Sequence, residues 1–544
     1  MQGKKESSPK ILYNVNLNDL VPKDNYYRLI NREIDFKFLY EATKKYYGKE
    51  GQESIDPVVF FKICLVGYLN NIGSDRKLVE YCSDSLAIRL FLKYDIDEPL
   101  PWHSTISRTR QLYGEEVFLR LFRKILSLCI TKGMVRGKRQ AIDSALIKAN
   151  ASMDSLTEKE ILDDAEIYAA ELSKNSETNT HRSKVSASKK KEVESRHKWQ
   201  KENYKHPGCE YKDGKEGDGG DHIQSKFYSN HTHYSATDPD SRISTKPGKP
   251  RNLNYLGQIS VDNANHVITG AVADFADKRD SQCLERICDQ VKKNFEEHHL
   301  RIRQIVTDTA YSSGEALKYC EENDIDAYIP NFGRYKPERE GFIYNKELDR
   351  YECIKGNKAV LTLQNACLKN GEYFVKRYSS RRQDCKACPF LEACCGKKME
   401  NKKLDDSIDK EYYDRMHKKL IDNGEYAKRL FRSRSSTVEP VFGTLMNHLN
   451  MKRVFTRGIA QATKHVLMAA LAYNLKKYLR FMNKRYIANF LVFPVKKMYN
   501  DQWFGNFFCI IVKFLVMNDC FGKIRLEPGF IFPGFVLGKS LSRK

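Results

Sequence analysis

The spacing of apolar and polar residues divides the chain into a helical part and a part in which strands alternate with helices. Between about residues 20 and 132, apolar side chains recur at the three- and four-residue intervals of amphipathic helices. The segment DPVVFFKICLVGYLNNI, residues 56–72, is apolar enough for a buried helix. Asp56 would be its N-cap and Pro57 its first residue, where the missing N–H is not needed. We expect an all-helical N-terminal domain.

Strand periodicity begins at Arg139, because Ala141, Asp143, Ala145 and Ile147 would share one face of an extended strand. Residues 152–226 are polar and poor in apolar side chains, which predicts an exposed, largely disordered insertion. Regular structure then resumes as two hairpin strands, a helix, a strand, a helix and a strand, at residues 255–262, 266–275, 280–293, 301–308, 313–323 and 325–329. This order is typical of a ribonuclease-H-like α/β domain.

The charge balance narrows the kind of partner. Lys and Arg number 93 against 70 Asp and Glu, a formal net charge of +23, which favours phosphate backbones because binding releases their counterions. The start MQGKKESSPK lacks the apolar core of a signal peptide. The longest apolar stretch, residues 504–517, contains Asn506 and Lys513 and is shorter than the about 20 residues that span a bilayer. We expect a cytoplasmic protein that binds nucleic acid, with no membrane partner.

Three carboxylates stand where a metal site could form. Asp143 and Asp308 close apolar runs that predict strands, and Glu439 precedes Pro440, which predicts that Glu439 opens a helix, since proline is tolerated in a first helical turn. In a ribonuclease-H-like sheet the first and fourth strands are neighbours, so Asp143 and Asp308 would converge. Two Mg²⁺ or Mn²⁺ ions on such oxygen ligands can activate a water or a 3'-hydroxyl and stabilise the leaving oxygen of a phosphodiester. Each residue alone could equally be an ordinary cap, but together they indicate cutting and joining of nucleic acid.

Basic and polar residues at two places in the chain, just before Glu439 and in the N-terminal domain, are candidate DNA contacts. Arg432 and Arg434 precede Glu439 and would suit phosphate oxygens, or would form a solvated basic turn. In the N-terminal domain, hydroxyls and guanidiniums gather at a predicted helix start, suited to a major groove or to a polar surface helix, at Ser104, Thr105, Arg108 and Arg110. Asp238 and Asp240 either line the active-site side or form an Asx-type turn.

The cysteines are mostly single and in apolar contexts, which indicates buried thiols. The exception is the run C-K-A-C-P-F-L-E-A-C, in which Cys385 and Cys388 form a C-x-x-C pair followed by Cys394. Such a pair presents two thiolates to one tetrahedral zinc ion. The alternative is a set of reduced thiols without metal. Cys395 and Cys367 are candidates for a fourth ligand.

Several segments, taken in their order and spacing, resemble one family. They are DPVVFFKICLVGYL, PWHSTISRTR, AIDSALIKANAS, THYSATDPDSRISTKPGKP with LNYLGQISVD, VTDTAYSS, and STVEPVFGTLMNHLNMKRVFTRG. From about residue 20 to residue 478 the chain resembles bacterial insertion-sequence transposases of the DDE type, in the long subgroup with a helical N-terminal domain.

The resemblance implies a transposase that cleaves DNA at transposon ends and transfers the strands into target DNA by a two-metal mechanism. Asp143, Asp308 and Glu439 would be the catalytic ligands of Mg²⁺ or Mn²⁺, and Cys353 would complete the structural zinc site. It further implies binding to terminal inverted repeats as a homodimer or larger assembly, in the bacterial cytoplasm and associated with the nucleoid.

The chain departs from the family pattern at two places. Met446 stands where many relatives carry Lys or Arg, so the basic role would pass to Lys452, Arg453 or Arg457, and after about residue 485 the sequence diverges. Two alternatives therefore stay open. One is a ribonuclease-H-like nuclease or resolvase without strand transfer, and the other is a decayed, non-catalytic DNA-binding protein.

The expected architecture is α+β and multidomain, with an all-α N-terminal DNA-binding domain followed by a ribonuclease-H-like α/β catalytic domain with insertions. The expected segments are residues 1–132 (helical N-terminal DNA-binding domain), 133–150 (first catalytic strand), 151–235 (basic, largely disordered insertion), 236–330 (ribonuclease-H-like core), 331–425 (insertion with the cysteine cluster), 426–485 (catalytic helical segment with Glu439) and 486–544 (divergent apolar tail).

Overall fold

The structure is a computed structural model in which the chain forms two compact units, Met1–Leu479 and Arg480–Lys544. It describes residues 16–48, 54–158, 230, 233–244, 251–331, 335, 337–355, 359–369, 373–386, 388–396 and 399–497. The predictions of a disordered insertion and of a divergent tail fall mainly on residues 159–229 and 498–544, which lie outside the described residues. The contacts described below belong to the first unit.

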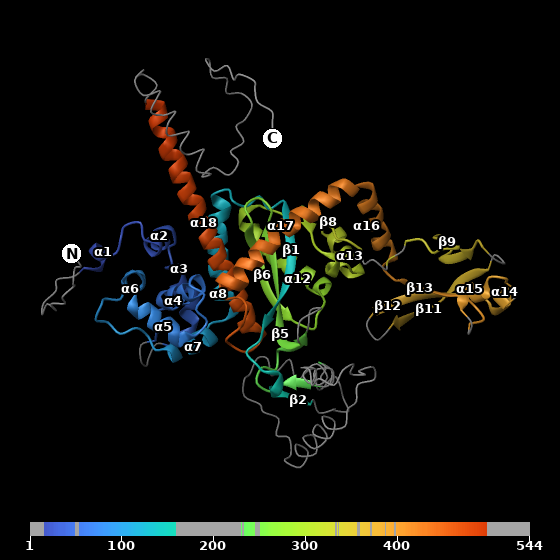
Figure 1. Cartoon of the computed structure of the whole chain (residues 1–544), viewed down its shortest axis with the longest axis horizontal. Helices are drawn as coiled ribbons and strands as arrows, with labels where there is room; N and C mark the ends of the chain where they lie inside the picture. Colours follow the sequence, from blue (N-terminus) through green and yellow to red (C-terminus); the bar gives the residue numbers. More distant parts are fainter. Residues whose placement is uncertain are drawn as a thin grey trace, which may run out of the picture. The chain divides into compact units, whose positions relative to one another are not determined.

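The N-terminal domain is helical, as predicted (Figure 1). Its central helix is α4 (Pro57–Leu69), and the Asp56 carboxylate caps it by accepting a hydrogen bond from the Val58 amide at 2.6 Å. Because Phe60 and Phe61 on neighbouring faces of α4 are both fully buried, the other helices must surround it. Those helices are α1 (Leu17–Leu20), α2 (Tyr26–Glu33), α3 (Phe38–Thr43), α5 (Asp75–Asp84), α6 (Leu86–Leu92), α7 (His103–Leu112) and α8 (Glu115–Thr131).

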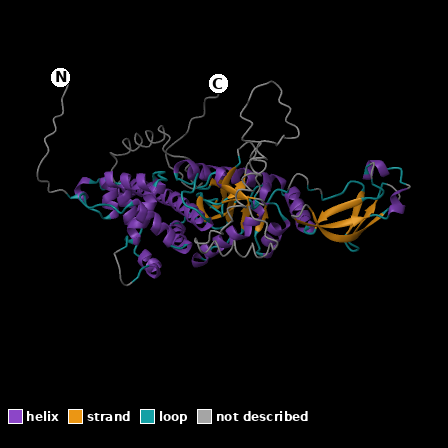
Figure 2. Cartoon of the chain, turned by 90° about the horizontal axis from the view of Figure 1, so that it is seen from below, coloured by secondary structure: helices purple, strands orange, loops and turns teal. Residues whose placement is uncertain are grey.

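A mixed sheet follows, drawn in orange in Figure 2. Its strand order confirms the predicted ribonuclease-H-like domain. β1 (Arg139–Lys148) lies between β5 (Asn252–Asp262), which is antiparallel to it, and β7 (Gln304–Val306), which is parallel. The sheet is extended by β6 (Val267–Phe275) and the short β4 (Arg242–Ser244) on β5, and by β8 (Asp326–Tyr328) on β7. β2 (Leu156–Glu158) and β3 (His233–Ser235) form a separate two-stranded sheet.

Helices complete the catalytic domain. α12 (Asp280–Phe295) packs on β6 and β5, and α13 (Gly314–Glu322) packs on α12. The long helix α17 (Gly424–His448) crosses β1 and β7, where its Ala427 and Leu430 are buried against Val306 and Tyr328. The glutamate-bearing helix therefore lies on the strand that carries Asp143 and beside the strand that precedes Asp308.

The cysteine-bearing insertion forms an antiparallel sheet of its own. Its strands run β13-β12-β11-β10-β9 around the buried side chains of Tyr351, Leu361 and Tyr378. The elements are β9 (Phe342–Asn345), β10 (Arg350–Cys353), β11 (Val360–Lys369), β12 (Tyr373–Ser379), α14 (Arg382–Lys386), α15 (Leu391–Cys395) and β13 (Lys403–Ser407).

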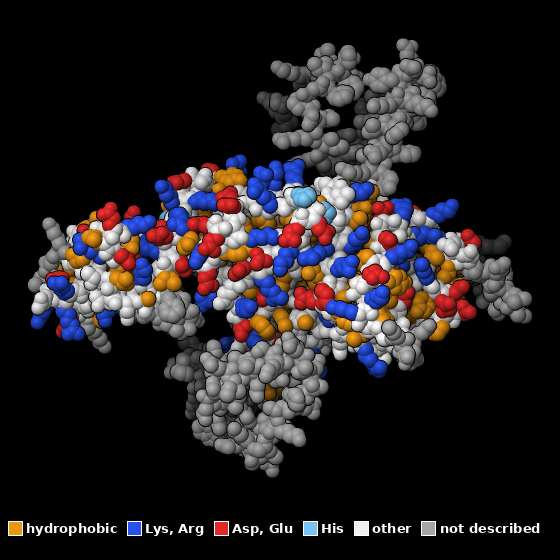
Figure 3. All heavy atoms as spheres, turned by 180° about the vertical axis from the view of Figure 1, so that it is seen from behind, with side chains coloured by type: hydrophobic (Ala, Val, Ile, Leu, Met, Phe, Trp, Pro, Cys, Tyr) orange, Lys and Arg blue, Asp and Glu red, His pale blue; other side chains and the backbone are white. Residues whose placement is uncertain are grey.

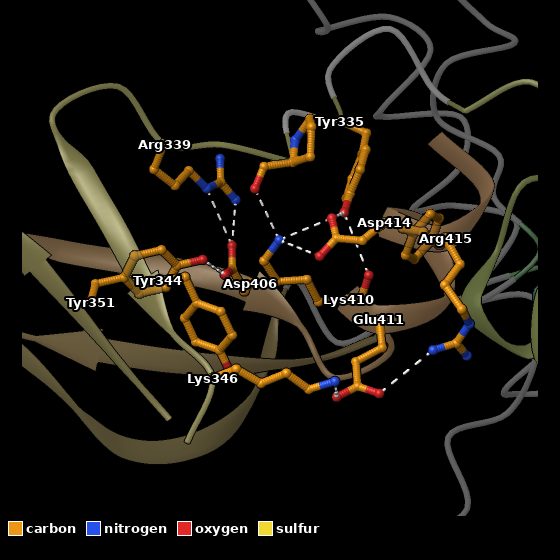
Figure 4. Close-up of polar contacts among 12 residues, drawn as sticks. Tyr335, Arg339, Tyr344, Lys346, Tyr351, Asp406, Lys410, Glu411, Asp414 and Arg415 are labelled. Atoms are coloured by element: carbon orange, nitrogen blue, oxygen red, sulfur yellow. Dashed lines mark hydrogen bonds and ion pairs between the residues drawn. The ribbon is translucent and has the colours of Figure 1, made fainter. Parts of the chain in front are cut away.

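Polar contacts join this insertion sheet to α16 (Lys410–Asp422), the helix that leads back to the core (Figure 4). Lys346, next to β9, pairs with Glu411 of α16 at 3.3 Å, and the Lys410 ammonium of α16 donates to the Pro337 carbonyl at 3.0 Å. α16 itself packs on α13. The insertion sheet thus ends at β13, and α16 lies against the catalytic domain.

The last long helix, α18 (Ile459–Lys497), reaches the N-terminal domain. The Tyr68 hydroxyl on α4 bonds to Nδ1 of His465 at 2.6 Å, and Lys464 donates to the Arg110 carbonyl at 3.1 Å. Within the described residues, no helix is both long and apolar enough to cross a bilayer.

The turn before α18 docks on the N-terminal domain through two asparagines. The Asn450 amide donates to the Asn71 side chain at 2.8 Å, and the Asn450 side chain donates to the Ile72 carbonyl at 3.3 Å. Both asparagines have a φ of 59°, a left-handed conformation that asparagine tolerates better than most residues. The segment that follows α17 is therefore held by the N-terminal domain.

Candidate active site

Asp143 and Asp308 lie side by side just beyond the parallel pairing of β1 with β7. Asp308 follows the end of β7, as predicted, but the prediction that Asp143 closes its strand is wrong, because β1 continues to Lys148. Ala141 on β1 is opposite Val306 on β7. Asp143 and Asp308 each follow two positions after these paired residues, so they lie at the same level of the two strands. Burial raises the pKa of Asp143, and the neighbouring Asp308 carboxylate raises it further. The predicted convergence of the first and fourth strands thus gives two acidic side chains whose charges interact.

The Asp308 carboxylate is oriented by a short turn. Asp308 is the N-cap of the 3₁₀ turn η4 (Thr309–Tyr311), and its Oδ1 accepts a hydrogen bond from the Ala310 amide at 3.0 Å. Such a cap fixes the direction of the side chain relative to the turn. The position of η4 therefore determines where the Asp308 oxygens lie.

Arg434 on α17 is the counterion of Asp143. Its guanidinium donates to Asp143 Oδ2 at 2.9 Å, and the two side chains are only 13% and 19% exposed. This contact lowers the pKa of Asp143 and so opposes the effects of burial and of Asp308. Arg434, a predicted phosphate contact, lies at the carboxylate pair, whereas the nearby Arg432 is exposed.

The prediction that Glu439 opens a helix is wrong. α17 begins at Gly424, and Pro440 lies inside it. Proline in a helix interior costs about 3 kcal/mol because the carbonyl four residues earlier loses its donor. Here that carbonyl belongs to Ser436, which is exposed to water like Pro440 itself, and the buried stripe of α17 continues on both sides through Leu430, Val438, Val441 and Leu445.

Glu439 does not join the two aspartates in this structure. It follows Arg434 by five residues, which places it about 140° around the helix from the residue that contacts Asp143. Its side chain is exposed. No three His, Cys, Asp or Glu side chains among the described residues are grouped closely enough to hold a metal ion. The structure therefore brings together two of the three predicted ligands.

The predicted DNA contacts divide into exposed and buried residues. Arg110 is largely buried and forms a two-point ion pair with Asp75, at 2.8 and 2.6 Å, so its guanidinium serves the fold and is removed from the candidate DNA contacts. Arg108 on the same helix is exposed, and Ser104 and Thr105 are half-buried. On the face shown in Figure 3, Lys and Arg side chains are interspersed with Asp and Glu.

The basic segment after α17 lies beside the far end of β1. The Lys148 amide donates to the Lys452 carbonyl at 3.2 Å, and the Val454 amide donates to the Lys148 carbonyl at 2.9 Å. The predicted contacts Lys452, Arg453 and Arg457 are exposed. From Asp143 to Lys148 the strand advances roughly 16 Å, at about 3.3 Å per residue. This basic surface is therefore close enough to contact the same DNA segment as the aspartates.

Among the described residues, the four predicted zinc ligands do not form a group close enough to hold a metal ion. Cys385 is buried, with its sulfur 3.1 Å from the Ser380 hydroxyl, and Cys388 and Cys394 are half-buried. Burial raises the pKa of Cys395 to about 11, and the adjacent Cys394 and Cys385 contribute. Cys353 lies on β10, opposite Phe342.

Asp238 and Asp240 have a structural role that the sequence left open. Asp238 Oδ1 accepts hydrogen bonds from the Tyr255 hydroxyl at 2.7 Å and the Gly458 amide at 2.9 Å. Asp240 Oδ2 accepts from the Ile459 amide at 2.9 Å. These carboxylates satisfy free N–H groups at the start of α18, as anions at a helix N-terminus do.

Two comparisons with known families agree with this architecture. Residues 15–112 match a transposase domain (DUF772), and residues 353–479 match a transposase DDE domain. The second match includes Glu439, whereas Asp143 and Asp308 lie outside it because both precede residue 353. No curated protein matches the chain. A helical N-terminal domain, a ribonuclease-H-like sheet and both matches make this chain similar to insertion-sequence transposases of the DDE type.

Proposed function

We propose that this transposase cleaves DNA at the ends of its transposon and joins each freed 3'-hydroxyl to target DNA. The observation that carries the proposal is the Asp143–Asp308 pair on the neighbouring parallel strands β1 and β7 of a ribonuclease-H-like sheet. The net charge of +23 suits a DNA partner. The N-terminal domain would bind the terminal inverted repeats, and the protein would act as a homodimer or larger assembly on nucleoid DNA in the cytoplasm.

The chemistry of the aspartate pair fits Mg²⁺ or Mn²⁺. Two neighbouring carboxylates repel each other in a largely buried site, and a divalent cation on their oxygens would offset that repulsion. Asp143 and Asp308 would hold the metal, and Glu439 is the proposed third ligand, supported by its place within the transposase DDE match. Two ions bound there would lower the pKa of the attacking hydroxyl and offset charge on the leaving oxygen.

The surrounding residues would position DNA. The Arg434 guanidinium neutralises Asp143, and its planar fork fits phosphate oxygens equally well, so we propose that Arg434 contacts the DNA backbone when a cation takes its place at Asp143. Lys452, Arg453 and Arg457 would contact phosphates beside the far end of β1.

A plasmid excision assay with purified end fragments tests the proposal. Asp143→Asn, Asp308→Asn and Glu439→Gln are each expected to abolish excision while end binding is retained. Glu425→Gln is the matched control, because Glu425 is also exposed on α17. Among the described residues its carboxylate forms one ion pair, with Lys428 at 2.9 Å. The activity of this variant should equal that of the unmodified protein.

Other outcomes would assign a different function. Cleavage without joining would indicate a nuclease or resolvase. End binding with neither reaction in the unmodified protein would indicate a non-catalytic DNA-binding protein. Full excision by Asp143→Asn or Asp308→Asn would contradict the proposed site.

We also propose that the cysteine cluster binds a structural zinc ion through Cys353, Cys385, Cys388 and Cys394. The support is the C-x-x-C spacing together with the interaction of the Cys385, Cys394 and Cys395 thiols. Zinc would stabilise the end of the insertion sheet, and it has no place in the proposed reaction.

A further inference from the structure

A buried polar contact lies behind the aspartate pair. Gln258 on β5 is opposite Ser144 on β1, and Asp143 is opposite Ile259. Because neighbouring residues along a strand point to opposite faces, the Gln258 side chain lies on the face away from Asp143, toward α12. There its Nε2 donates to Asp280 Oδ1, at the start of α12, at 3.2 Å. Gln258 is fully buried.

Tyr311 connects this glutamine to the turn that bears Asp308. It is the last residue of η4, it is fully buried, and its hydroxyl donates to Gln258 Oε1. The Asp308 side chain is bound to the Ala310 amide within the same turn. The chain of contacts therefore runs from the Asp308 turn through Tyr311 to Gln258 on β5 and on to α12.

We propose that Tyr311 and Gln258 are positioning residues that hold the Asp308 carboxylate beside Asp143 for metal binding. The proposal rests on the proposed function of the aspartate pair. β7 ends at Val306, so the sheet ladder stops before Asp308, and the buried anchor of Tyr311 fixes the turn. Apolar residues of similar size could fill the same space, but they would lack the hydrogen bond that holds the η4 turn in one orientation relative to β5.

Calorimetric titration of the full-length protein with Mn²⁺ alone tests the inference. Tyr311→Phe and Gln258→Met are each expected to weaken Mn²⁺ binding by about 10- to 100-fold, the usual effect of removing a group that orients a metal ligand. The matched control is Tyr319→Phe. Like Tyr311, Tyr319 donates its hydroxyl to a side-chain oxygen, that of Asp289 on α12 at 2.5 Å, but it lies on α13 and not on the Asp308 turn. This variant should bind Mn²⁺ like the unmodified protein.

The double variant Tyr311→Phe/Gln258→Met separates positioning from stability. Replacing both partners by apolar groups leaves neither of them unpaired, so its thermal stability should exceed that of the less stable single variant. Its Mn²⁺ affinity should stay weak. Recovery of the original affinity in the double variant, or unchanged affinity in Gln258→Met, would overturn the inference.

The same titration distinguishes this inference from the proposed function. If Asp143→Asn and Asp308→Asn also bind Mn²⁺ as the unmodified protein does, the metal site itself is wrong. If only those two variants lose Mn²⁺ and the Tyr311 and Gln258 variants keep it, the site stands and the positioning role fails. Should Tyr311→Phe fold poorly, Gln258→Met and the double variant still decide the matter.

Discussion

Replacing Arg434 with methionine tests how far the Asp143 carboxylate depends on a positive charge from α17. The pair is largely buried, with side chains 13% and 19% exposed. Removing one partner of a buried ion pair costs about 3–5 kcal/mol, because the other charge is left without compensation. Here the loss should be smaller, about 2–3 kcal/mol, because the raised pKa of Asp143 lets the carboxyl take up a proton instead.

Hydrogen exchange of the β1 and α17 peptides is the suitable assay, since it reports local opening in a chain too large for two-state unfolding. Arg434→Met should lower the opening free energy of β1, whereas the exposed Arg432→Met should stay within about 0.5 kcal/mol of the unmodified protein. In an Asp143→Asn background, most of the effect of Arg434→Met should disappear, because the amide has no charge to compensate.

Mn²⁺ provides a second measurement on the same variants. An ion present at 100 times its Kd stabilises the form that binds it by about 2.7 kcal/mol. In Arg434→Met the ion does not compete with a guanidinium, so Mn²⁺ should stabilise β1 of this variant more than β1 of the unmodified protein. The reasoning is refuted if Arg434→Met behaves like Arg432→Met, or if its effect is the same in the Asp143→Asn background.

Three further results are expected. Burial lowers the pKa of His465 to about 4, against 6.5 for an unperturbed histidine. As the pH falls, the unfolded chain therefore binds a proton at this residue before the folded chain does, and the free energy of unfolding should fall by about 3 kcal/mol from pH 6.5 to pH 4. Thermal unfolding of His465→Asn should lack this part of the pH profile, and an unchanged profile would contradict the assignment. Gly73→Ala would place its Cβ 2.2 Å from the Phe455 ring and should speed limited proteolysis of the turn before α18, whereas Gly443→Ala, which meets nothing within 4 Å, should slow it or leave it unchanged. The purified protein should contain about one zinc ion per chain and Cys388→Ser should contain less, as measured by atomic emission; equal zinc in both would argue against the site.

Local signals in the sequence predicted the elements that local chemistry determines. Asp56 and Pro57 mark the start of α4 because a cap and a proline act on their own helical turn. Asp143 and Asp308 could be paired in advance because the order of strands and helices implies which strands are neighbours. The first prediction depends on neighbouring residues of one helical turn, and the second depends on the order of strands and helices along the chain.

Contacts between distant segments explain what the sequence did not reveal. Pro440 predicted a helix start, but the apolar stripe of α17 packs on the sheet and outweighs the local cost of proline. Arg434 and Asp143 are 291 positions apart, so no spacing indicated their ion pair. Gln258 carries only a weak signal, a polar residue within an apolar strand, and its partner Tyr311 lies 53 positions away, so no spacing indicated their hydrogen bond.

The asparagine turns at Asn71 and Asn450 bear on how such a protein could be redirected to new DNA ends. Grafting a foreign N-terminal domain onto this catalytic domain would place an unrelated loop against Asn450, whose own segment hydrogen-bonds to β1 at Lys148. A chimaera of that kind would disturb the strand that bears Asp143 even if the new domain folded normally. A workable exchange has to carry residues 449–456 together with the domain that they fit.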